Sequence, residues 1–153
     1  MNNDKAVSTL NDLIETLRDG QNGFKEAAEN AQNPDLKTFF NQVSLERAQM
    51  AGELQQEVHA LGQEPENSGS AAAALHRTWM DIKGTLTGRD DKAILNECER
   101  GEDSAVRTFQ DALKDQDLPT NLRTLIDHQF RQVKLVHDRV KQMRDAQSAV
   151  SGR

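Results

Sequence analysis

A chain of 153 residues is long enough for one hydrophobic core and short for two, so we expect a single domain over residues 1–153. Its 25 acidic and 19 basic side chains give a net charge of −6, which disfavours nucleic acid or an anionic membrane as a partner because either would repel most of the surface. One cysteine forms no intrachain disulfide, no apolar run has the length of a membrane span, and the first residues lack the pattern of a secretory signal. We therefore expect a cytoplasmic protein.

Long apolar stripes at helical spacing, with only three prolines in the chain, predict an all-α protein. The first helix is predicted over residues 3–31. Asn33 is then a suitable N-cap, and Pro34 fits the first turn of a new helix. The second helix is predicted over residues 34–61.

A polar segment rich in turn residues follows the second helix, and after it the chain returns to helical periodicity. A shorter amphipathic stretch is predicted to be helical over residues 71–87, and Gly88 is expected to end it. The third long helix is predicted over residues 89–114 and the fourth over residues 118–145. The last residues, 146–153, are expected to fray.

The four long helices have similar predicted lengths, roughly 26 to 29 residues or about 40 Å each, which indicates one four-helix bundle. The two short connections make two antiparallel hairpins. The segment from Gly62 to Gly88 is long enough to run the full length of the bundle. We therefore expect ferritin-like connectivity, with a long and partly helical crossover between the second and third long helices.

Glu102 interrupts an otherwise apolar stripe on the third long helix. A carboxylate that faces a bundle core needs a partner, because an unpaired buried charge costs several kcal/mol. Arg47 falls near the centre of the stripe on the second helix, and Gln21 and Gln129 also point inward, where they could hydrogen-bond to a buried ion pair. The sequence thus predicts a buried polar cluster that fixes helix register more than it adds stability: Gln21, Arg47, Glu102 and Gln129.

A metal site is the alternative role for these positions. Ferritin-like di-iron centres take one glutamate from each of two helices and a Glu-x-x-His pair from each of the other two. Here Gln21 stands where the first helix would supply a carboxylate, Glu46 begins a Glu-x-x-Gln, and Lys134 stands three residues before a histidine. We therefore expect no metal or other cofactor. The ligands that a reduced metal site would retain are Glu46, Glu102 and His137.

Three segments of the chain, residues 10–30, 95–113 and 135–145, resemble an uncharacterised and mainly proteobacterial family of ferritin-like four-helix bundles. The motif-like pieces are Asp19-Gly20 with Gly23-Phe24, and Glu99-Arg100-Gly101-Glu102-Asp103. The resemblance covers most of residues 4–145. It implies the fold and a domain of unknown function, and it carries no established reaction, so no catalytic residue follows from it.

Two functions of different classes remain open. We favour a non-catalytic bundle with a binding, structural or stress-associated role, because most of the di-iron ligands are missing. Residues 118–153 hold seven Lys or Arg against three Asp, which leaves a net charge of −10 on residues 1–117 and makes a homodimer or a protein partner plausible on charge grounds. The alternative is a metal-binding protein, for iron storage or di-iron oxidase-like chemistry, that uses the reduced ligand set.

Overall fold

The computed structural model describes residues 2–63 and 88–151. This part of the chain contains no strand and four α-helices, which are α1 (Asn3–Asn30), α2 (Pro34–Ala60), α4 (Asp91–Leu113) and α5 (Thr120–Ser151). Each helix begins within two residues of its predicted start. The helix predicted over residues 71–87 lies outside the described residues.

Local capping chemistry accounts for where two of these helices begin. The side chain of Asn33 accepts a hydrogen bond from the backbone N–H of Asp35 at 2.8 Å, and Pro34 occupies the first turn of α2, as predicted. Asp90 caps α4 by accepting from the backbone N–H of Ala93 at 2.8 Å. Both caps use an unpaired N–H group of the first turn, so the sequence itself sets the start of each helix.

The end of α5 lies beyond the predicted end of the fourth long helix. The helix continues to Ser151, whereas the sequence predicted it over residues 118–145 with residues 146–153 frayed; residues 152–153 lie outside the described residues, and the fraying stays a prediction. The segment after Asp145 contains no glycine or proline before Gly152, and alanine and glutamine are good helix formers. Nothing in the local sequence therefore stops α5 at its predicted end.

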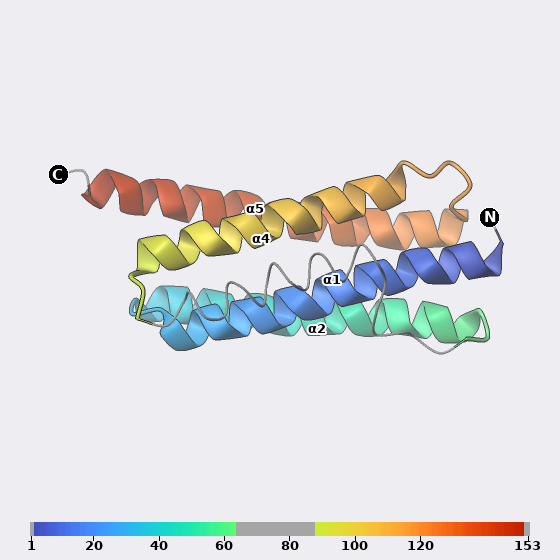
Figure 1. The fold of residues 1–153 in the computed structure, drawn as a ribbon, viewed down its shortest axis with the longest axis horizontal. Helices are drawn as coiled ribbons and strands as arrows, with labels where there is room; N and C mark the ends of the chain where they lie inside the picture. Colours follow the sequence, from blue (N-terminus) through green and yellow to red (C-terminus); the bar gives the residue numbers. More distant parts are fainter. Residues whose placement is uncertain (1, 64–87, 152–153) are drawn as a thin grey trace.

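The helices form two antiparallel hairpins, α1 with α2 and α4 with α5, that lie side by side (Figure 1). The carboxylate of Asp91, at the start of α4, accepts hydrogen bonds from the backbone N–H groups of Gln32 at 2.7 Å and Asn33 at 3.0 Å. At the other end of the bundle, Gln63 donates to the side chain of Asp4 at 3.2 Å. Because α2 ends at one end of the bundle and α4 starts at the other, the connectivity is the ferritin-like one that the helix lengths predict.

Among the described residues, α1 packs against both α2 and α4, while α5 packs mainly against α4 and only sparsely against α2. The backbones of α2 and α4 make no close approach, so these two helices lie on a diagonal of the bundle. None of the described helices carries an apolar stretch long enough to cross a membrane.

The apolar core has two halves, and each half takes side chains from all four helices. One half contains Leu10, Leu54, Phe109 and Ile126, and the other contains Phe24, Phe40, Ile94 and Val140. On α2, the buried residues of the second half end at Val43 and those of the first half begin at Met50. On α4, the buried residues of the second half end at Cys98 and those of the first half begin at Ala105. Arg47 and Glu102 are buried in these intervals. The middle of the bundle is therefore a polar layer between two apolar ones.

Candidate functional site

The centre of the polar layer is an ion pair between Arg47 of α2 and Glu102 of α4. Nη1 of Arg47 donates to Oε1 of Glu102 at 2.8 Å, and Nη2 donates to Oε2 at 2.6 Å. The two side chains are 1% and 0% exposed. Two parallel, charge-assisted hydrogen bonds make a strong and directional contact. The structure thus gives Glu102 the partner expected from the sequence, and the contact links the two hairpins across the diagonal.

Helix α1 makes room for the guanidinium group. A Cβ atom on Gly20 would lie 3.1 Å from Nη1 of Arg47, so the absence of a side chain at this position allows the close approach. The Arg47 guanidinium also lies 5.5 Å from the centre of the Phe24 ring, within the range of a cation–π contact. Gly20 and Phe24 belong to the motif-like pieces noted in the sequence, and both serve the placement of Arg47.

The two glutamines of the predicted cluster do not hydrogen-bond to this pair, which corrects that part of the expectation. The side-chain oxygen of Gln21 accepts from Nη1 of Arg18 at 3.0 Å, because Arg18 lies one turn earlier on the same helix. Nε2 of Gln129 donates to the backbone oxygen of Met50 at 3.1 Å, about one turn of α2 away from Arg47. Gln129 is nevertheless fully buried.

The reduced ligand set of the metal alternative is not assembled either. Glu46 is exposed, and its carboxylate accepts from Gln42 at 3.3 Å. Both oxygens of Glu102 are held by the guanidinium group of Arg47, and His137 contacts other carboxylates. A permanent positive charge therefore stands beside the inward-facing carboxylate, and the described residues of the core do not fit a di-iron centre.

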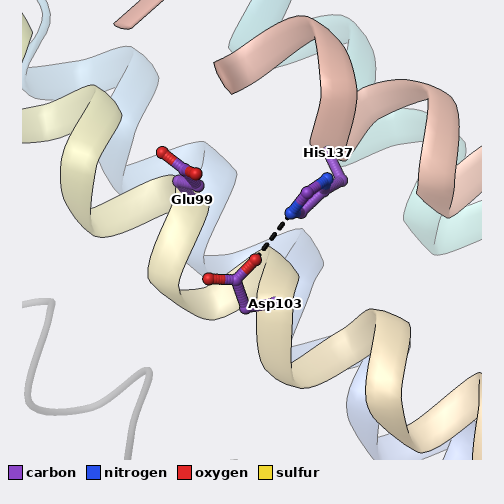
Figure 2. A group of neighbouring side chains, drawn as sticks. All are labelled: Glu99, Asp103 and His137. Atoms are coloured by element: carbon purple, nitrogen blue, oxygen red, sulfur yellow. Dashed lines mark hydrogen bonds and ion pairs between the residues drawn. The ribbon is translucent and has the colours of Figure 1, made fainter.

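A second polar group lies at the edge of the same layer, where α4 meets α5. We call Glu99, Asp103 and His137 the seam cluster (Figure 2). One ligand atom from each of the three residues lies within 4.8 Å of the other two. Nε2 of His137 is 2.6 Å from Oδ1 of Asp103, and Nδ1 is 3.0 Å from Oδ1 of Asp138. Glu99 forms an ion pair with Arg144 through Oε2.

The three side chains of the seam cluster differ in their exposure to solvent. The side chains of His137 and Glu99 are 15% and 13% exposed, whereas that of Asp103 is 49% exposed. Partial burial lowers the pKa of His137, but hydrogen bonds to Asp138 and Asp103 outweigh it, so the pKa of His137 is raised. Hydrogen bonds from Lys134 and then from His137 lower the pKa of Asp138.

The seam cluster was not predicted from the sequence, where His137 was a candidate ligand only together with Glu46 and Glu102. The signal that could have found it is the four-residue spacing of Glu99 and Asp103, which puts both carboxylates on one side of a helix. That the side in question faces His137 depends on the packing of α4 against α5.

Comparison with solved structures supports the fold. A structure titled Mycobacterium smegmatis Dps tetragonal form has a TM-score of 0.76 and 17% sequence identity to this chain, covering 94% of this chain and 89% of that one. At this identity the likeness is one of fold. No curated protein matches the chain.

The family comparison covers most of the bundle. A family model described as Domain of unknown function (DUF2383) matches residues 5–115, a range that holds nearly all of α1, the whole of α2 and α4, the Arg47–Glu102 pair and two residues of the seam cluster. The match spans well over half of the chain. This chain therefore belongs to the DUF2383 family of domains of unknown function.

Proposed function

We propose that this chain is a non-catalytic ferritin-like bundle with a structural or binding role. In this proposal the Arg47–Glu102 ion pair fills the mid-bundle position at which di-iron proteins of this fold class hold their metal ligands. The observation that supports it is the bidentate contact itself, made by two side chains that are almost wholly excluded from solvent.

The chemistry of the pair supports a structural role over a catalytic one. Arginine keeps its positive charge at any physiological pH, so it repels a second cation at the same place. The carboxylate of Glu102 has both oxygens engaged, so it is poorly available as a metal ligand, a base or a nucleophile. A buried pair of this kind holds two elements in one arrangement, which suits a bundle that acts as a scaffold or binding surface.

We further propose a homodimer, or a complex with another acidic protein, in the cytoplasm. Residues 118–153 are basic, while the rest of the chain is strongly acidic. In a two-fold dimer one patch meets its own copy, so the patch would have to contain both basic residues of α5 and acidic residues from elsewhere in the same chain. The single cysteine, which is buried, agrees with a reducing compartment. A stress-associated role stays a prediction from the sequence.

Iron reconstitution tests the proposal. Untagged protein, purified without chelator, is incubated anaerobically with ferrous iron, desalted, assayed for metal content and then exposed to oxygen. Glu102→Gln should leave metal content and oxygen consumption as in the wild type. Glu46→Gln, which removes the same charge from an exposed position, is the matched control. Retention of about two iron ions per chain, the content of a di-iron centre, that is lost only in Glu102→Gln would overturn the proposal.

Sedimentation equilibrium at low and high salt tests the dimer. A mass of two chains at low ionic strength that falls as salt is added is expected if complementary charges hold the copies together. A monomer at every salt concentration would exclude the homodimer and leave an acidic protein partner as the proposal.

A further inference from the structure

We propose that the seam cluster binds one divalent transition-metal ion of the zinc class. Glu99 and Asp103 reach it from α4 and His137 from α5, and the three ligand atoms converge within 4.8 Å (Figure 2). An imidazole with two carboxylates is a ligand set that zinc accepts. This site is distinct from the Arg47–Glu102 pair, and it does not depend on the function proposed above.

The orientation of His137 supports a ligand role. Its Nδ1 lies 3.0 Å from Oδ1 of Asp138, and its Nε2 faces Asp103. Metal-binding histidines characteristically donate one ring N–H to a carboxylate, which fixes the tautomer and directs the other nitrogen to the metal. Asp138 is placed to be that positioning residue, while Nε2 of His137 would be the ligand.

Both carboxylates of the cluster retain an oxygen for a metal. Arg144 pairs with Oε2 of Glu99, and His137 contacts Oδ1 of Asp103. Within residues 2–63 and 88–151, the structure gives no hydrogen bond to Oε1 of Glu99 or to Oδ2 of Asp103. Metal binding therefore does not require the Glu99–Arg144 ion pair to break.

The separations can adjust to a metal by small side-chain rotations. Two ligands of a tetrahedral zinc ion at about 2.1 Å are roughly 3.4 Å apart. If Oδ1 of Asp103 is the ligand, its 2.6 Å contact with Nε2 of His137 must open by roughly 0.8 Å, and separations of up to 4.8 Å must close by up to about 1.4 Å. Three protein ligands would leave the fourth position for water.

The charge around the cluster favours a divalent cation. Four carboxylates, Glu99, Asp103, Asp138 and Asp145, lie in or next to the seam cluster, together with three cations, Lys134, Arg144 and Arg107, the last of which donates to the backbone oxygen of Asp103. A neutral imidazole therefore leaves the group with net negative charge. The imidazole also selects the class of metal, because magnesium and calcium prefer oxygen ligands and retained water.

Isothermal titration calorimetry of the full chain with zinc tests this site, after chelator treatment and in a buffer that does not bind metals. We expect saturable binding of one zinc ion per chain, and no comparable heat with magnesium or calcium. His137→Gln should weaken zinc binding at least tenfold, and Asp138→Asn should weaken it by about tenfold, as loss of a positioning carboxylate does in other metal sites. His128→Gln changes an exposed histidine of the same helix and should leave the affinity unchanged.

Two results would overturn the proposal. One is the absence of saturable zinc binding, and the other is binding that His137→Gln leaves intact. Circular dichroism shows whether each variant is folded, and Asp103→Asn replaces His137→Gln if the latter is not. Glu46→Gln separates the seam cluster from the reduced ligand set of Glu46, Glu102 and His137: zinc binding that survives in Glu46→Gln and fails in His137→Gln belongs to the seam cluster.

Discussion

Removing one partner of the buried ion pair should cost more stability than replacing both. In Glu102→Gln the guanidinium group of Arg47 stays 1% exposed and loses its counter-charge, with two charge-assisted hydrogen bonds of 2.8 and 2.6 Å. Because water does not screen the pair, the free energy of unfolding should fall by about 3–5 kcal/mol. The double variant Arg47→Met with Glu102→Leu removes both charges, so its stability should be equal to the wild type or up to about 4 kcal/mol higher.

Urea unfolding followed by circular dichroism measures these changes, with the denaturant slope checked for constancy. The matched control is Asp127→Asn, which breaks an ion pair with Arg131 whose side chains are 42% and 76% exposed. That change should cost less than about 1 kcal/mol. If Glu102→Gln also cost less than about 1 kcal/mol, the buried pair would not be energetically coupled and the reasoning would be refuted.

Three further predictions follow from single positions. Gly20→Ala brings a Cβ to 3.1 Å from Nη1 of Arg47 and should lower the free energy of unfolding by about 1 kcal/mol. Gly52→Ala, whose Cβ would meet no atom within 4 Å, should raise it by about 0.5–1 kcal/mol. Urea unfolding measures both changes, and equal effects of the two variants would contradict this reasoning. Burial, reinforced by two nearby glutamates, raises the pKa of the Cys98 thiol, so a thiol reagent should label it only after unfolding, and rapid labelling of native protein would refute its placement. Among the described residues, Oε1 of Gln129 is buried without a hydrogen-bond partner, so Gln129→Met should raise the free energy of unfolding by about 1 kcal/mol. The melting temperature should rise accordingly, and a lower melting temperature would argue against this.

The fold could be predicted because its signals are local. Apolar stripes at helical spacing reveal each helix, and residues such as Asn33 and Pro34 mark a boundary through chemistry confined to one turn. Matched helix lengths with one long connection then leave few topologies. The end of α5 at Ser151 has no such local signal, because none of the residues between Asp145 and Gly152 breaks a helix.

The site was predictable only in part, because its contacts depend on how the helices are placed against one another. Arg47 and Glu102 could be paired since each is a charge at the centre of an apolar stripe. The hydrogen-bond partners of Gln21 and Gln129 depend on how far each side chain lies from Arg47 and Glu102 along the bundle axis. Helical periodicity does not specify this distance to within one turn. The seam cluster further depends on the rotation of α4 about its axis, which brings Asp103 toward His137.

The ion pair and the seam cluster are coupled through the register of α4. Apolar stripes repeat every turn, so a shift of α4 by one turn, about 5.4 Å, would still bury apolar side chains. It would leave Arg47 and Glu102 buried without partners, at a cost of several kcal/mol. We infer that the pair fixes the height of α4, and Glu99 and Asp103 flank Glu102 on that helix. The double variant Arg47→Met with Glu102→Leu should therefore keep its stability yet hold the seam ligands less firmly, and a weaker zinc affinity in that variant would report the loss of register control.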